Sequence, residues 1–212
     1  MGRNVEGLYP ASRVSFLIDA DRFFRALVES IVKAEEQIVI VGWDTDSRTE
    51  LPLPDDFPWE VTEKQKEQGS ISFGDLLEMA VAKKPNLHIY ILSWDFTFIY
   101  LFERETLPGV KFSQLESERI RFVLDHEHPT MASHHQKVVV VDDKVAFSGG
   151  LDITQRRWDT PDHKGHDPRR VDPGGHSYGP FHDVQICVEG EIARALGNLV
   201  RRRWFNATSE RL

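Results

Sequence analysis

The order of hydrophobic and polar positions predicts an alternation of short strands and helices in the first part of the chain. Val14 to Ile18 has the character of a strand, and Asp19 stands where a helix N-cap is expected. Apolar residues then recur at three- and four-residue spacing, which predicts an amphipathic helix from Ala20 to about Glu36. The uninterrupted apolar run from Gln37 to Trp43 favours a strand buried on both faces.

The alternation continues as far as residue 125. Ser72 is expected to cap a second helix that ends near Lys84, and Leu87 to Trp94 is expected to be another buried strand. Phe96 to Thr106 has the pattern of a further helix, and Ile120 to Leu124 has that of a strand. Strands and helices that alternate in this way predict an α/β layer structure with helices on both faces of the sheet.

The second part of the chain changes the expected sheet from parallel to mixed. Val138 to Val141 is a run of four β-branched residues, Asp142 to Lys144 is turn-like, and Val145 to Ser148 resumes the strand pattern. These three segments predict an antiparallel hairpin. Asp183 to Val188 and Glu191 to Phe205 are expected to add a last strand and a closing helix. The predicted fold class is therefore α/β, with a mixed parallel and antiparallel sheet flanked by helices.

Two segments lack a regular apolar pattern and are expected on the surface. Glu50 to Gly69 is rich in proline and in charge. Residues 159–181 are rich in Asp, His, Gly, Pro and Arg and contain almost no aliphatic side chain. Long loops of this kind in compact domains are often functional. The chain as a whole is expected to form a single domain over residues 1–212.

Composition and charge narrow the functions that this fold can carry. The 212 residues include 13 Phe and 5 Trp, too many large apolar side chains for a disordered chain. The formal net charge of −8 argues against a general nucleic-acid binder, which neutralises phosphates with Lys and Arg. The single Cys excludes an intrachain disulfide, and no apolar run reaches the roughly 18 residues of a membrane span. We therefore expect a cytoplasmic protein or one that binds peripherally to a membrane.

The strongest chemical signal lies around the predicted hairpin. Residues two apart on a strand share a face, so His135 and Lys137 are expected to project together. Closing the hairpin over residues 142–144 places Gly149 and Gly150 beside them, where backbone amides can approach a ligand closely. An ammonium, an imidazole and bare amides in one place predict a phosphate-binding pocket.

The carboxylates near this pair are expected to have different roles. Asp142 lies five residues beyond the lysine, roughly 17 Å along an extended strand, and is expected to be structural. Asp152 lies nearer to the histidine and is expected to contact the substrate. A catalytic imidazole also needs a carboxylate that fixes its tautomer, and spacing leaves Asp183, Asp152 and Asp159 as alternatives for this role.

These residues resemble those of a known family. The pattern His135-x-Lys137-x-x-x-x-Asp142, followed by Gly149-Gly150, is similar to the HKD motif of the phospholipase D superfamily. The later segment Arg157-Trp158-Asp159 extends the likeness to the first catalytic half of two-motif members. The resemblance implies a mixed sheet flanked by helices. It also implies phosphodiester cleavage through a covalent phosphohistidine, with no metal or other cofactor.

Carried over residue by residue, the resemblance makes His135 a nucleophile or proton donor and Lys137 a phosphate ligand, and it favours Asp183 as the acid that orients His135. Family members need two such motifs, because one histidine attacks phosphorus while the other protonates the leaving group. No second His-x-Lys occurs in the chain. A second domain of a longer chain, or a second subunit, is expected to complete the site. The first is preferred, because the flanks resemble first halves.

The resemblance implies glycerophospholipids as substrates, cleaved by water or transferred to an alcohol. Two alternatives use the same residues: a homodimeric nuclease, which the negative charge disfavours, and a non-catalytic phosphate-binding or regulatory domain. A zinc site is not expected, because the histidines between residues 163 and 182 have no compact ligand spacing. Trp43 and Trp94 end their strands, and they are expected either at the ligand-facing edge or in the core.

Overall fold

A seven-stranded mixed sheet forms the centre of the protein, seen here in a computed structural model that describes residues 4–95, 112, 117–128 and 132–212. The strands lie in the order β1-β9-β8-β7-β2-β5-β6. Their bounds are Arg13–Ile18 for β1, Gln37–Gly42 for β2, His88–Trp94 for β5, Ile120–Asp125 for β6, Val138–Val141 for β7, Val145–Gly149 for β8 and Val184–Glu189 for β9.

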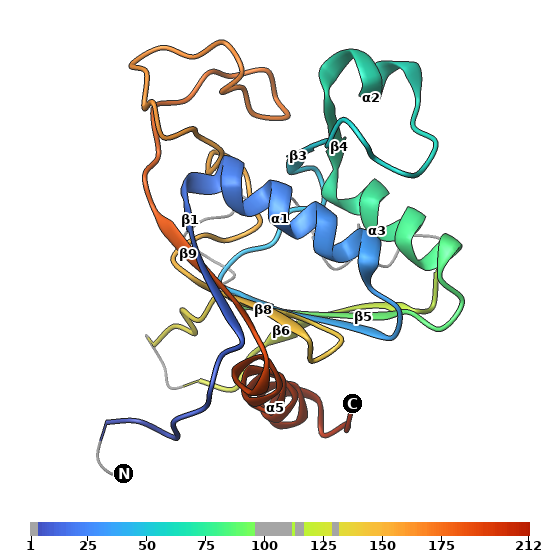
Figure 1. Cartoon of the computed structure of the whole chain (residues 1–212), viewed down its shortest axis with the longest axis vertical. Coiled ribbons are helices and arrows are strands. Elements are labelled where there is room, and N and C mark those ends of the chain that lie inside the picture. Colours follow the sequence, from blue (N-terminus) through green and yellow to red (C-terminus); the bar gives the residue numbers. More distant parts are fainter. Residues whose placement is uncertain (1–3, 96–111, 113–116, 129–131) are drawn as a thin grey trace.

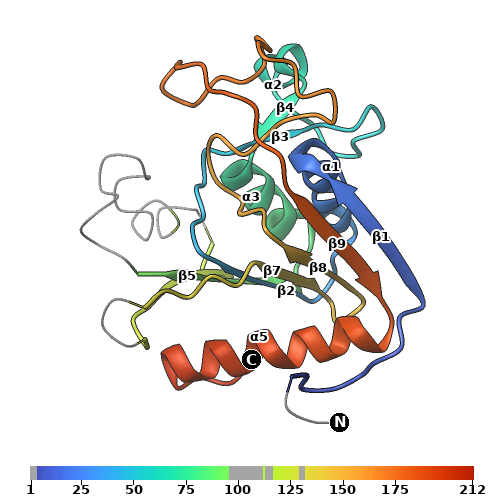
Figure 2. The same ribbon diagram turned by 90° about the vertical axis from the view of Figure 1, so that its left-hand side faces the viewer.

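Helices cover both faces of this sheet (Figures 1 and 2). Helices α1 (Asp19–Lys33) and α3 (Phe73–Lys83) lie on one face, and α5 (Glu191–Thr208) lies on the other. Strand β2 supplies Ile38 and Ile40 to the core under α1 and α3, and Val39 to the core under α5. Alternate residues of a strand point to opposite faces, which explains its uninterrupted apolar run. The predicted fold class is confirmed.

The predicted hairpin forms with the expected register. Val141 pairs with Val145 and Val138 with Ser148, so β7 and β8 are antiparallel. Strand β7 is also antiparallel to β2, whereas β2 and β5 run parallel. Asp142 and Asp143 occupy the turn with φ angles of 51° and 54°. Asp tolerates this left-handed region better than most residues.

The start of α1 differs from the prediction. The N-cap residue is Ile18, and no side chain caps the helix. Asp19 has a φ of 64°, and its carboxylate accepts the backbone N–H of Asp183 at 3.2 Å instead of a helix amide. The N-cap role of Asp19 is therefore wrong, because the side chain is directed at a neighbouring segment. The Ser72 cap of α3 is confirmed, since its hydroxyl accepts the Asp75 N–H at 3.2 Å.

The segments outside the main sheet also carry structure that the sequence pattern did not predict. Strand β3 (Glu50–Pro52) pairs with β4 (Ser70–Ser72), and helix α2 (Glu63–Gln68) lies between them. Residues 159–181 contain no strand or helix, and they extend beside this β3–β4 unit (Figures 1 and 2). The helix predicted over residues 96–106 lies outside the described residues. Among the described helices, none has the length and apolar character needed to cross a membrane.

Candidate active site

His135 and Lys137 meet at a single aromatic ring. Both residues immediately precede β7, and Trp43 immediately follows β2, the neighbouring strand. The Lys137 Nζ atom lies 5.9 Å from the centre of the Trp43 ring. The His135 ring centre lies 6.1 Å from the same ring, inclined by 60°. The fold therefore places a cation and an imidazole around one half-buried indole, where the neighbouring strands β2 and β7 end and begin.

Lys137 is held by a buried carboxylate. Its Nζ atom lies 3.0 Å from Oδ2 of Asp152, and the side chains are 6% and 2% exposed. Asp152 also accepts the backbone N–H of Trp43 at 2.9 Å. The Nζ atom itself is buried, and within the described residues no other side chain or backbone group forms a hydrogen bond of good geometry with it. Asp152 thus anchors the cation, which differs from the substrate contact expected from the sequence.

Burial has a direct effect on the Asp152 carboxyl. Desolvation raises its pKa above the ordinary value, while the Lys137 charge and the amides of Trp43 and Asp44 act in the opposite direction. A buried carboxylate is stable as an anion only when it is paired and hydrogen-bonded. Lys137 and Asp152 therefore depend on each other for their charged states.

The two glycines have a different role from the one predicted. The Gly149 N–H donates to Lys137 O at 3.4 Å and the Gly150 N–H to Val184 O at 3.2 Å, so neither amide is free for a phosphate. A Cβ on Gly150 would lie 2.2 and 2.3 Å from the carboxylate oxygens of Asp183. The expectation that these amides face a ligand is wrong. Glycine is needed there because β9 and its preceding residue approach so closely.

Asp183 points at this glycine, not at His135. Its Oδ1 atom accepts the N–H of Val184 at 2.7 Å. In the described part of the chain, no hydrogen bond or ion pair joins Asp183 to His135. The structure thus brings the expected orienting acid to the same end of the hairpin, but it does not form the expected contact.

The other two acids flagged by the sequence hold the backbone together. Asp142 accepts the N–H groups of Glu35, Glu36 and Gln37 at 2.8–2.9 Å, which ties the turn of the hairpin to the start of β2. Asp159 is fully buried and pairs with Arg170 at 3.0 Å. Burial acts to raise the pKa of Asp159, but hydrogen bonds from Thr160, His163 and Phe181 outweigh it and lower the pKa.

The site is open on one side. His135 is exposed, whereas Lys137 is buried. The cavity beside Lys137 and Asp152 measures about 10 Å³, and its walls do not include His135. Such a space holds about one water molecule, too little for a phosphoryl group. The glycine-lined, phosphate-binding pocket expected from the sequence is therefore not formed by the described residues of this chain alone.

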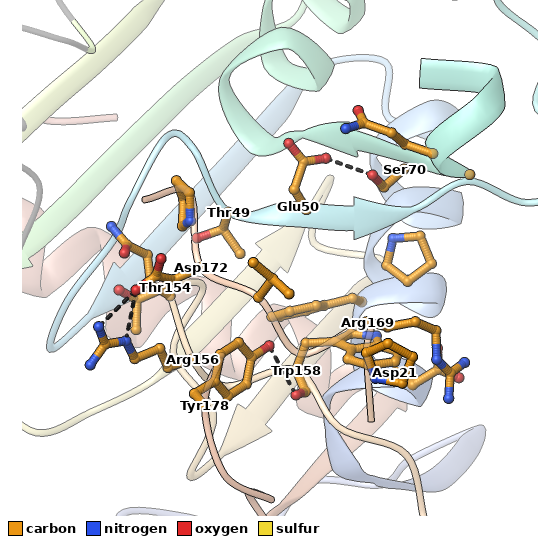
Figure 3. A pocket seen from close by; sticks show the side chains of 18 of the residues that line it. Asp21, Thr49, Glu50, Ser70, Thr154, Arg156, Trp158, Arg169, Asp172 and Tyr178 are labelled. Atoms are coloured by element: carbon orange, nitrogen blue, oxygen red, sulfur yellow. Dashed lines mark hydrogen bonds and ion pairs between the residues drawn. The ribbon is translucent and has the colours of Figure 1, made fainter. Parts of the chain in front are cut away.

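A larger hollow of about 440 Å³ lies elsewhere, between α1, the β3–β4 unit and the 159–181 loop (Figure 3). Figure 3 shows Arg156 paired with Asp172, and the Tyr178 hydroxyl donating to Trp158 O at 3.2 Å. Neither His135 nor Lys137 lines this hollow. The hollow is therefore separate from the candidate catalytic residues. Most of its polar side chains are already paired.

Known proteins share both the motif and the fold. A family model described as Phospholipase D matches residues 101–211, more than half of the chain. The chain belongs to the phospholipase D family. It is 30% identical to phospholipase D zeta 1 of Arabidopsis thaliana over 91% of this chain and 19% of that protein. It is 28% identical to phospholipase D C of Dictyostelium discoideum over 90% of this chain and 12% of that protein. The chain thus spans less than a third of the length of these phospholipases D.

Solved structures of low sequence identity show the same fold. NucT from Helicobacter pylori superposes with a TM-score of 0.57 at 11% identity, covering 91% of this chain and 95% of that one. The phosphatidylserine synthase of Haemophilus influenzae superposes with a TM-score of 0.55 at 16% identity, covering 91% of this chain and 38% of that one. The mixed sheet with its flanking helices is therefore the phospholipase D fold.

Proposed function

We propose that this chain supplies one half of a two-motif active site that cleaves glycerophospholipids at a phosphodiester bond, with water or an alcohol as acceptor. The observation that carries the proposal is the meeting of the exposed His135 imidazole and the buried Lys137 ammonium at Trp43. Membership of the phospholipase D family, shown by the family model that matches residues 101–211, supports it.

The proposed reaction has two displacement steps. A nitrogen of His135 attacks phosphorus, and the P–N bond forms as the P–O bond to the leaving alcohol breaks. The histidine of a second motif gives its proton to the leaving oxygen. That histidine then takes a proton from water or an alcohol, whose oxygen attacks phosphorus and releases His135. Lys137 balances the negative charge on the phosphoryl oxygens in both steps.

Asp183 is the acid that we propose to orient His135. Its carboxylate lies against Gly150, at the end of the hairpin where His135 is placed. Its present hydrogen bond is to the adjacent Val184 N–H, which a change of side-chain rotamer releases. A carboxylate in contact with the imidazole stabilises the charge that develops there during attack.

An exposed apolar patch offers a docking surface for the proposed second half. Phe16 and Ile18 of β1, with Ile186 and Val184 opposite them on β9, share one face of the sheet and are all exposed. An apolar patch of paired strand residues marks an interaction surface. We propose that the half carrying the second motif covers this patch, and that it belongs to the same longer chain. The relatives are several times longer than the part that this chain matches, which leaves ample sequence for it.

An activated substrate tests the nucleophile without the second motif. p-Nitrophenolate is a stable anion and leaves without a proton, so a phosphodiester that carries it requires no general acid. We expect the purified 212-residue chain to release one equivalent of p-nitrophenolate and to retain an acid-labile phosphoryl adduct on His135, detected by mass spectrometry. His135→Asn is expected to abolish both signals.

His134→Ala is the matched control, because the neighbouring His134 ring contacts the Glu127 carbonyl at 2.9 Å and not Trp43. Its burst is expected to equal that of the unchanged chain. Sustained turnover with a dimeric mass keeps the chemistry and assigns the second motif to a second subunit, which overturns the proposal that both motifs belong to one longer chain. A chain that forms no adduct, or forms it equally with His135→Asn, is a binding or regulatory domain and not a catalytic half.

A further inference from the structure

Three side chains from distant parts of the chain converge at the start of α1. The fully buried Asp19 carboxylate lies 2.7 Å from Nδ1 of His182 through Oδ1, and 3.0 Å from Nε2 of His163 through Oδ2. The two imidazole rings stand edge to face, with centres 4.6 Å apart. One ligand atom from each residue lies within 4.8 Å of the others. Two imidazoles and a carboxylate form a common ligand set for zinc.

One oxygen of Asp19 lacks the hydrogen bond that its burial requires. Although His163 Nε2 is 3.0 Å away, Oδ2 accepts no hydrogen bond within the described residues, because the N–H direction of that ring misses it. A buried, unsatisfied carboxylate oxygen is costly. Two ligands of one tetrahedral zinc ion, with bonds of about 2.0–2.1 Å, lie roughly 3.3 Å apart. The separation of these atoms is close to that value.

The Nδ1 side of the His163 ring has the kind of hydrogen-bond partner that is typical of a metal-binding histidine. Its Nδ1 atom lies 3.1 Å from Oδ2 of Asp159, and Asp159 is held in turn by Arg170 at 3.0 Å. A histidine that gives its Nδ1–H to a carboxylate presents a lone pair at Nε2. That lone pair has the direction of the absent N–H, so it misses Oδ2 of Asp19, and a cation placed beside both atoms would satisfy the two acceptors.

The backbone at Asp19 supports the same conclusion. Its φ of 64° lies in the left-handed region, which Asp tolerates better than most residues but which is uncommon at the first residue of a helix. Here it directs a carboxylate away from the amides at the start of α1, which an Asp at this position ordinarily caps. The Asp19 carboxylate therefore does not cap the helix and instead contacts two imidazoles.

We propose that Asp19, His163 and His182 bind one Zn²⁺ ion, with solvent in the fourth position. Imidazole ligands favour zinc over Mg²⁺ and Ca²⁺, which prefer oxygen ligands. The ion joins the 159–181 loop and the start of β9 to the first residue of α1. None of the three ligands contacts His135 in the described structure, but Asp19 accepts the Asp183 N–H at 3.2 Å, so the ion also fixes the backbone of the proposed orienting acid. The role of the ion is to hold the loop on the domain.

Metal titration tests this site directly. The 212-residue chain, stripped with a chelator, is titrated with Zn²⁺ against a chromophoric competitor, and with Co²⁺ to read the d–d absorption of a tetrahedral site. We expect one equivalent to bind and to raise Tm. His163→Ala and His182→Ala, which alter partly exposed side chains, are each expected to weaken binding at least 100-fold and to remove the rise in Tm.

His166→Ala is the matched control, because it changes an exposed histidine of the same loop outside the cluster. It is expected to bind Zn²⁺ as the unchanged chain does. Circular dichroism establishes that each variant is folded. The site is refuted if the folded, unchanged chain binds no zinc at 100 μM, or if His182→Ala binds it equally well. Either result leaves the cluster as a hydrogen-bonded pair of histidines on a buried carboxylate.

Discussion

The Lys137–Asp152 ion pair is the part of the candidate active site whose energetics follow most directly from the structure. The charges lie 3.0 Å apart, and both side chains are almost completely buried. Removing one partner of a buried pair leaves an uncompensated charge, at a cost of about 3–5 kcal/mol. Replacing both residues with uncharged side chains of similar shape often changes the free energy of unfolding very little.

A double-mutant cycle separates these two effects. Asp152→Asn removes the carboxylate charge but keeps an oxygen for the Trp43 amide, and Lys137→Met removes the ammonium with little change in length. Each single variant is expected to lose about 3–5 kcal/mol. At about 2–4 °C per kcal/mol for a chain of this size, Tm falls by roughly 6–20 °C. The double variant is expected to lose much less than the sum of the single variants, with a coupling energy of about 2 kcal/mol or more.

Urea unfolding of the four proteins at pH 7, followed by circular dichroism, measures the cycle. If both single variants lose less than about 1 kcal/mol, the pair behaves as an exposed one and the reasoning is refuted.

The pH dependence of stability gives a second check on the buried pair. Because burial raises the pKa of Asp152, the folded state binds this proton more tightly than the unfolded chain does. Its contribution to stability therefore falls as pH rises from about 4 through the raised pKa, and Asp152→Asn lacks this fall.

Three further predictions concern the fold around the site. Asp142→Ala removes the acceptor of three backbone N–H groups and is expected to lower the unfolding free energy by about 3 kcal/mol in urea, with Asp142→Asn losing less. Burial acts to raise the pKa of Asp172, but the His176 amide and Arg156 outweigh it and lower it to about 2. Its contribution to stability is therefore complete above about pH 4 and lost as pH falls toward 2, and Asp172→Asn is expected to flatten urea midpoints across that range. Phe16→Asp is expected to weaken association with the second catalytic half at least tenfold in a binding assay, while leaving Tm of this chain within a few degrees.

The elements that the sequence predicted correctly are those determined by local pattern. Val138 to Val141 forms a strand because four β-branched residues suit a sheet buried on both faces, and the Asp142–Asp143 turn follows it directly. Short strands at the two ends of the 50–72 segment escaped prediction, because β3 and β4 are each three residues long and pair only with each other. A three-residue strand gives too little periodicity to recognise.

The site was predictable in its residue types and less so in its contacts. His135 and Lys137 follow from a strand rule and a motif, but the roles of Gly149 and Gly150 depend on β9, which is more than 30 residues away along the chain. The sequence left Trp43 either at the ligand-facing edge or in the core, and only the placement of β2 beside β7 decides that it lies at the site. The Asp19 cluster was not predictable from spacing, because its histidines follow Asp19 by more than 140 residues.

The open side of the site affects what each of the two proposed halves contributes to the reaction. An interaction between Lys137 and a phosphoryl oxygen is weak where water surrounds it and becomes much stronger where water is excluded. Lys137 is already buried on its own side, held by Asp152, but His135 faces solvent. In the proposed two-motif site, a covering half would therefore do more than supply the second proton donor, because it would also lower the local dielectric around a cation that this half has already positioned. On this proposal, docking of the two halves also stabilises the transition state, and Phe16→Asp is expected to lower kcat of the assembled enzyme only through the fraction that remains docked.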